Sequence, residues 1–206
     1  MNTGKISALA VALSLGLMTT ADADEWTGGY LTFGLSNTAI DFRSTTPVTL
    51  EADRGRQDDW SPYVAGGYDW AHGNLTYGFV VDLEGADVSQ DIVSVGKGFT
   101  GDSDWFATLR ARVGMPVNDK MHVYGSAGLA AMGVGSTMTG IFVSGSEHRT
   151  LTGTAAGLGM EYVLSPGRHL SLEYLHADFG EADFHDGAVT REPAVDTIRL
   201  GYTLRF

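Results

Sequence analysis

The last ten residues of the chain alternate between two kinds of side chain. From Thr197 to Phe206, odd-numbered positions hold threonine, arginine or glycine, and even-numbered positions hold isoleucine, leucine, tyrosine or phenylalanine. Neighbouring side chains of a β-strand point to opposite faces, so the pattern predicts a strand with one apolar and one polar face. About ten residues is also the length that a tilted strand needs to cross a bilayer. The segment therefore predicts a membrane-spanning strand.

Other segments of similar length bring the number of predicted strands to eight. Counting the last strand, the alternation is clear in four of the eight. It is less regular in three glycine-rich segments, and the eighth segment opens the mature chain. The eight predicted strands are residues 26–36, 60–71, 75–84, 107–114, 121–133, 151–164, 170–175 and 197–206. An even number lets an antiparallel sheet close with both chain ends on the periplasmic side.

The predicted connections are alternately short and long. The short ones contain the glycine, proline and asparagine residues that form tight turns, and they are residues 72–74, 116–120 and 165–168. The long ones are residues 37–59, 85–103, 134–150 and 179–194. Short periplasmic turns and long extracellular loops are typical of outer-membrane proteins. The predicted fold class is therefore all-β: an eight-stranded antiparallel transmembrane β-barrel with four long extracellular loops.

A soluble lipocalin-like barrel or a β-sandwich would also show alternating strands. Such a fold buries its apolar residues and exposes its charges to water. Here the polar face combines arginine, glutamate, glycine and serine, as expected of a narrow lumen in which charges pair. The apolar face carries aromatic residues at its ends, including Trp70, Tyr162, Tyr202 and Phe206, which is typical of a membrane interface. These features favour the membrane barrel.

The first residues have the organisation of an export signal. Lys5 precedes an apolar run over residues 6–18, and small residues follow, ending with Ala21 and Ala23. This pattern predicts a signal peptide at 1–23, with cleavage after Ala23 and cleavage after Ala21 as the open alternative. The run is too short to cross a bilayer of about 30 Å as a helix. We therefore predict export through the inner membrane and one mature barrel domain at 24–206.

The composition limits the classes of function. The chain has 25 acidic and 13 basic residues, which argues against a nucleic-acid partner because such binding needs a basic surface. It has no cysteine, although an exported protein could form disulfides. Stability should therefore come from the hydrogen-bonded framework of a closed barrel.

Several segments resemble a known family. They are residues 26–30, 157–162, 172–180 and 202–206. Together they resemble the small outer-membrane β-barrel proteins called the porin family, with their OmpA-type and opacity-type relatives. The resemblance covers nearly the whole mature chain and its motifs are structural. It implies that Tyr202, Leu204 and Phe206 form a C-terminal sorting signal that the barrel assembly machinery reads.

The alternation places eight charged residues inside the predicted barrel. This lumen charge network consists of Asp82, Glu84, Arg110, Arg112, Glu161, Glu173, Arg199 and Arg205. An eight-stranded barrel has room for little more than side chains, and buried charges are costly unless they are paired. We predict that the network plugs the lumen. The alternative is an ion path that opens when the charges exchange partners.

His169, Ser171 and Glu173 are the candidates for chemistry. A histidine can take the proton from a serine hydroxyl while a carboxylate orients its ring, and the set resembles that of an outer-membrane lipid A deacylase. However, these residues follow the short turn at Pro166, which places them at the periplasmic end, far from the outer leaflet. We expect them to be lumen-facing polar residues without a catalytic role.

Acidic residues are frequent in the predicted long loops, namely Asp53, Asp58, Asp59, Asp87, Asp91, Asp102, Asp104, Glu181, Asp183 and Asp186. Carboxylates of this kind gather divalent cations, but no spacing matches a calcium-binding loop. We expect solvated loop charges, and we expect His148 and His185 to be exposed rather than metal ligands. No metal, cofactor or catalytic residue is predicted.

The sequence leads to three hypotheses of function. The first is a structural or surface-interaction protein of the Gram-negative outer membrane whose loops make its contacts. The second is a small, low-conductance porin, and the third is an enzyme that modifies envelope lipid. The expected partners are outer-membrane lipid, lipopolysaccharide and, during biogenesis, the barrel assembly machinery. A closed barrel has no free edge, so we expect a monomer.

Overall fold

The computed structural model describes residues 25–45, 54–94, 97–140, 144–180, 182–184 and 189–206. These residues form strands joined by tight turns. The strands are β1 (Gly28–Thr45), β2 (Arg54–His72), β3 (Leu75–Ser94), β4 (Lys97–Asn118), β5 (Met121–Gly140), β6 (Ser144–Ser165), β7 (Arg168–Asp178), β8 (Ala182–Phe184) and β9 (Val189–Arg205). Among the described residues, no helix is long and apolar enough to cross a membrane.

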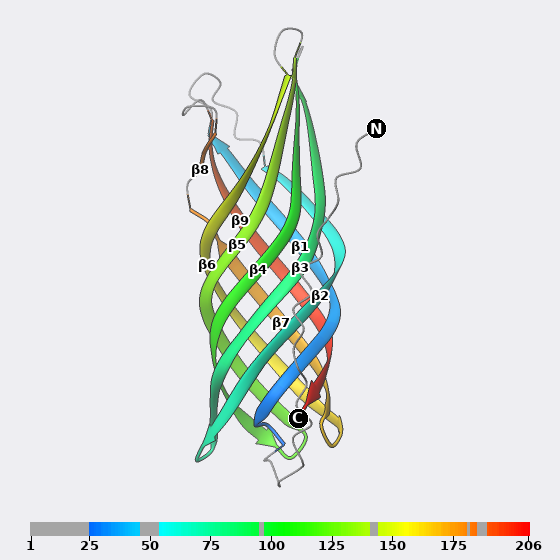
Figure 1. Cartoon of the computed structure of the whole chain (residues 1–206), viewed down its shortest axis with the longest axis vertical. Helices are drawn as coiled ribbons and strands as arrows, with labels where there is room; N and C mark the ends of the chain where they lie inside the picture. Colours follow the sequence, from blue (N-terminus) through cyan, green and yellow to red (C-terminus); the bar gives the residue numbers. More distant parts are fainter. Residues whose placement is uncertain (1–24, 46–53, 95–96, 141–143, 181, 185–188) are drawn as a thin grey trace.

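Eight of the strands close into a barrel (Figure 1). Each strand from β1 to β7 pairs antiparallel with the next, β7 pairs with β9, and β9 returns to β1 from Tyr30↔Arg205 to Thr45↔Thr190. The short strand β8 pairs only with the outer end of β9. The structure thus confirms the eight-stranded antiparallel barrel. The predicted short turns are at one end, where Gly73 and Gly167 adopt φ values of 62° and 69° that suit glycine.

The outer wall is apolar, and charged and polar side chains point into the interior. In β7, exposed and buried residues alternate over the whole strand. In β9, Arg199 is 0% exposed, whereas the neighbouring Leu200 is 51% exposed. A soluble protein would have the opposite arrangement. The exposed apolar side chains form the surface that faces lipid, as the alternation predicts.

The predicted boundaries of the long connections are wrong. β1 continues to Thr45, β3 to Ser94 and β5 to Gly140, so most residues of these predicted loops are in strands. The reason is physical. Outside the bilayer both faces of a strand meet water, so a strand there needs no alternation, and the sequence pattern cannot detect it.

At its outer end the barrel divides into two lobes. Pairing between β2 and β3 ends at Tyr63↔Glu84, and pairing between β6 and β7 ends at Thr154↔Asp178. Beyond these points β3, β4, β5 and β6 stay paired as one lobe, while β2, β1, β9 and β8 form the other. In Figure 1 the first lobe, in green shades, reaches further from the barrel than the second.

Candidate functional site

All eight residues of the lumen charge network lie inside the barrel. The most exposed of them, Arg205, is only 9% exposed, and Glu84, Arg110, Glu161 and Arg199 are 0% or 1% exposed. They come from strands β3, β4, β6, β7 and β9, so the network links different parts of the wall. Charges buried to this extent need partners.

The middle of the lumen contains two arginines that share three carboxylates. Arg110 forms a two-pronged contact with Glu173, with Nη1–Oε1 at 2.7 Å and Nη2–Oε2 at 3.2 Å, and its Nη2 lies 2.8 Å from Asp82. Arg199 Nη2 lies 2.9 Å from Glu84 and 3.1 Å from the other oxygen of Asp82. The two-pronged contact of Arg110 is the strong geometry for such pairs. Arg199 instead places its Nε and Nη2 on a single oxygen of Glu84, and its Nη1 makes no hydrogen bond to the described residues.

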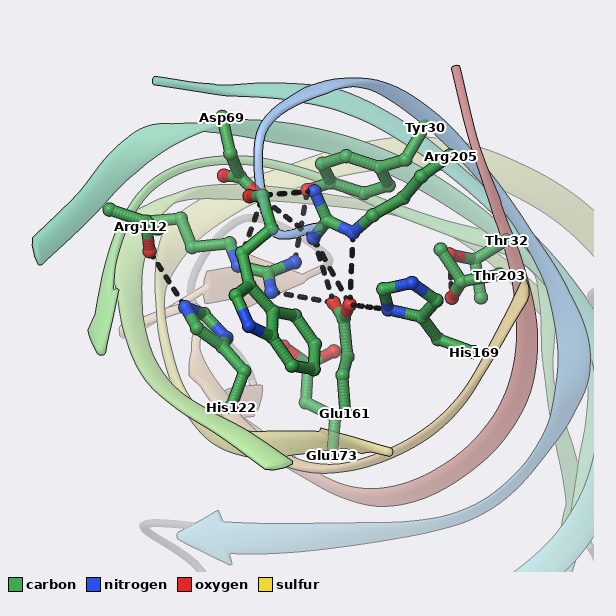
Figure 2. A network of polar contacts seen from close by, with 12 residues as sticks. Tyr30, Thr32, Asp69, Arg112, His122, Glu161, His169, Glu173, Thr203 and Arg205 are labelled. Atoms are coloured by element: carbon green, nitrogen blue, oxygen red, sulfur yellow. Dashed lines mark hydrogen bonds and ion pairs between the residues drawn. The ribbon is translucent and has the colours of Figure 1, made fainter. Parts of the chain in front are cut away.

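A second layer lies closer to the periplasmic end (Figure 2). Arg112 Nη2 is 2.6 Å from Glu161, and Arg205 Nη2 is 3.0 Å from the same carboxylate and 2.9 Å from Asp69. The Arg112 guanidinium also lies over the ring of Tyr124, 3.6 Å from its centre. The sequence analysis missed Asp69. The outward-facing aromatic residues on either side of it were the signal that it points inward.

The periplasmic mouth is closed by four residues, of which the sequence analysis identified only His169. This periplasmic cap consists of Glu25, Trp26, His122 and His169. The Trp26 ring stacks on His122 and meets His169 edge-on, each at 5.0 Å between ring centres. Because Trp26 precedes β1, the chain enters the lumen before it enters the barrel wall.

His169 connects the cap to the charge layer above it. Its Nδ1 lies 3.2 Å from Glu161 and its Nε2 lies 3.1 Å from Glu25. Each ring nitrogen thus faces a different carboxylate, so the imidazole links the first residues of the described chain to the charge layer.

The outer half of the lumen is apolar, which the sequence analysis did not predict. This apolar plug consists of Phe106, Ala130, Met132, Val134, Ala155, Leu175, Ala177, Phe179 and Val195. It lies beyond the charges toward the outer end, and the rings of Phe106 and Phe179 meet edge-on at 6.2 Å. Segments such as β5 are apolar on both faces, so alternation gave no signal there.

The candidate catalytic set does not assemble. His169, Ser171 and Glu173 all face the lumen, and each is at most 8% exposed. His169 contacts Glu161 and Glu25, and Glu173 pairs with Arg110. Among the described residues, no hydrogen bond joins the three, so the histidine is not placed to activate the serine.

The acidic residues predicted in loops are mostly in strands. Those found in strands are Asp58, Asp59, Asp87, Asp91, Asp102, Asp104 and Asp183. His148 lies in β6 and is exposed. The remaining ones, Asp53, Glu181, Asp186 and His185, lie outside the described residues. Within the described part of the chain, no group of three or more His, Cys, Asp or Glu residues could hold a metal ion.

The structure describes the predicted C-terminal sorting signal but not the predicted signal peptide. Tyr202, Leu204 and Phe206 lie together on the outer wall of β9 and the residue after it, and each is at least 38% exposed. Their role as a sorting signal stays a prediction. The predicted signal peptide at 1–23, with Ala21 and Ala23, lies outside the described residues.

Comparisons with known proteins agree with the geometry. The family model called outer membrane protein beta-barrel domain matches residues 7–206. The chain is 26% identical over 207 residues to the 31 kDa outer-membrane immunogenic protein of Brucella melitensis, covering 90% of this chain and 85% of that protein. It is 31% identical over 142 residues to the 22 kDa outer membrane protein of Rhizobium leguminosarum, covering 68% and 63%.

Two solved structures share the fold. Neisserial surface protein A matches with a TM-score of 0.55 and 13% identity, covering 87% of this chain and 98% of that one. The outer membrane protein OprG of Pseudomonas aeruginosa matches with a TM-score of 0.51 and 12% identity, covering 87% and 96%.

Proposed function

Because this chain belongs to the outer membrane protein beta-barrel domain family, we propose that it is a closed structural scaffold whose outer lobes make contacts at the cell surface. It is located in the outer membrane. In this proposal the lumen carries no solute and no catalysis takes place in it. The partners are outer-membrane lipid and lipopolysaccharide around the wall, and the barrel assembly machinery during biogenesis.

The observation that supports a closed lumen is its filling over the whole length. The periplasmic cap, two layers of paired charges and the apolar plug follow one another from the inner to the outer end. An ion would have to separate several arginine–carboxylate pairs and then cross an apolar layer. Breaking one such pair costs about 3 kcal/mol or more, so opening the path is expensive.

The outer lobes supply the surface for contacts. They continue the wall as paired strands beyond Glu84 and Asp178, so their backbone is held in place. Binding residues are often presented in this way, on exposed segments positioned by a rigid frame. A relative is named for its immunogenicity, which suits a protein whose outer parts are recognised at the surface.

Single-channel recording in a planar bilayer tests the closed lumen. Insertion is first verified by the heat-dependent gel mobility of the folded barrel. We expect no discrete openings from inserted protein. Reproducible openings would overturn the proposal in favour of the small porin, and Arg110 and Arg199 would then be the residues to mutate in search of the gate.

A second experiment tests the lobes. Removing residues 136–147 shortens the β5–β6 hairpin, whose strands pair there from Ser136↔Glu147 onward, and leaves the barrel intact. We expect cells that carry this variant to lose recognition of their surface by antiserum and binding to host cells, whereas Thr203→Ser in the lumen leaves both unchanged. A phenotype that follows the lumen variant instead would contradict the surface role.

A further inference from the structure

The wall formed by β4 to β7 has a groove on its lipid-facing side. Two adjoining hollows of about 690 and 590 Å³ share Val113, Gly125, Leu158 and Tyr174, so they form one continuous groove. We call it the wall groove. Its outer part is lined by small residues, Ala111, Ala127 and Ala156, between larger neighbours. Elsewhere, as on β3, large apolar side chains such as Val81 and Leu83 fill the outward positions.

The two ends of the wall groove differ in chemistry. The end toward the periplasm is lined by Leu75, Met115 and Met160. The outer end reaches His176 and Tyr174. A hollow that is apolar at one end and polar at the other suits an amphipathic molecule whose polar end points outward.

A polar cluster marks the outer end. His176 Nδ1 lies 2.9 Å from Asp196 Oδ1, and the hydroxyl of Tyr174 donates to the same oxygen at 2.5 Å. The side chain of His176 is 47% exposed and that of Asp196 is 31% exposed, so both face outward. Ionisable groups on such a wall are costly and usually serve a purpose. Nδ1 is held by Asp196, and the Nε2 atom on the other edge of the ring has no hydrogen bond to any described residue, so it can meet a ligand.

The wall groove is long enough for part of an acyl chain. Along β5 it runs from Val123 to Ala127, which is about 14 Å at the usual rise of a strand. Strands of such barrels are tilted by about 40° to the bilayer normal, so this length corresponds to about 10 Å of depth, or about one third of the hydrocarbon core. An acyl chain that descends past His176 would lie over Ala127 and Ala156 in the outer part of the groove.

We propose that the wall groove binds one glycolipid of the outer leaflet. An acyl chain lies over Ala127 and Ala156, and a sugar hydroxyl of the head group pairs with His176 Nε2. The surrounding wall already contacts the bilayer, so the site is continuous with the lipid interface. This inference does not depend on whether the lumen conducts.

Native mass spectrometry of the protein purified from outer membranes tests the proposal. The probes are lipid A and phosphatidylglycerol, titrated separately in detergent. Two groove variants are compared. The first combines Ala127→Leu and Ala156→Leu in one protein and fills the hollow, and the second is His176→Ala, which removes the head-group contact. The control is Val81→Leu, on the wall of β3. All four proteins are verified as folded by heat-dependent gel mobility.

We expect wild type and the control to retain one lipid A per barrel and to bind it at least tenfold more tightly than phosphatidylglycerol. The double variant with the filled groove should bind lipid A with about tenfold lower affinity than wild type. His176→Ala should lose the preference for lipid A and keep weak binding of either lipid. Equal lipid A binding by the filled groove and the control would overturn the site. Equal affinity of wild type for both lipids would overturn the head-group assignment, and a second protein copy displaced by filling the groove would overturn the lipid as occupant.

Discussion

Arg110 of β4 and Glu173 of β7 meet face to face in the lumen, with Nη1 on Oε1 at 2.7 Å and Nη2 on Oε2 at 3.2 Å. The two strands are not neighbours in the sheet, so this pair crosses the interior. The contact joins parts of the wall that backbone hydrogen bonds do not connect directly.

Removal of one member of this pair should destabilise the barrel. Glu173→Ala leaves Arg110 with Asp82 alone and takes one acid from Arg199. We expect a loss of about 3 kcal/mol in the free energy of unfolding, because two buried donors of Arg110 lose their hydrogen bonds to Glu173. Urea unfolding in lipid vesicles measures it. Asp119→Ala, in an exposed turn, is the control, and an equal effect of both variants would contradict the role of the pair.

The lipid-facing and lumen-facing positions of β9 should differ in tolerance. Leu200 is 51% exposed and lies between Leu35 and Leu172 of the flanking strands. Leu200→Arg should lower the free energy of unfolding by about 2 to 4 kcal/mol near the bilayer midplane. Thr203→Ser should cost little, because the serine hydroxyl can keep the 2.8 Å contact with Thr32. Equal stability of the two variants in vesicles would refute the assignment of faces.

Gly201 should not accept a side chain. A Cβ atom there would lie 2.6 Å from Thr32 Cγ2 and 2.7 Å from Ser171 Oγ, too close for either neighbour. We expect Gly201→Ala to destabilise by about 1 to 3 kcal/mol, as overpacking does. Gly85→Ala is the matched control because a Cβ atom placed there would have no neighbour within 4 Å among the described residues. The unfolding midpoints of the two variants are compared. Equal midpoints would contradict the prediction, because they would mean that Thr32 and Ser171 move aside at no cost.

The periplasmic cap should contribute to stability although it precedes the first strand. Trp26 is 4% exposed, and its carbonyl accepts a hydrogen bond from Arg205 at 3.0 Å. Trp26→Ala should cost about 3 kcal/mol through lost packing. Hydrogen exchange followed by mass spectrometry should also show faster exchange near His122 and His169. Trp26→Phe should restore part of both effects, and unchanged exchange in Trp26→Ala would mean that the cap does not seal the mouth.

Much of the fold follows from local sequence pattern. In β7 and β9 the alternation identifies both the strand and the direction of each side chain, because a bilayer outside and a narrow lumen inside demand opposite residue types. The same logic places the eight charged residues inside. The pattern weakens in β5, where alanine, glycine and methionine occupy both faces, and it is not required beyond the bilayer, where no lipid contacts the outer face of a strand.

The tertiary structure decided which charges pair and which residues fill the outer half of the lumen. The sequence indicates that Arg199 points inward, but its contact with Glu84 depends on the stagger between β3 and β9, which lie on different parts of the wall. The apolar plug likewise forms from residues of β4, β5, β6, β7 and β9, together with Phe179 just after β7, that meet only when the barrel closes.

The sequence by itself therefore determined the class of fold, the membrane in which it lies and the face of each clearly alternating residue, since these depend on the chemistry of neighbours along one strand. The tertiary structure alone decided which charges pair, how Trp26 enters the mouth and where the wall is hollowed. These depend on the register between strands, and register brings together residues such as Glu25 and His169 that are far apart in the chain.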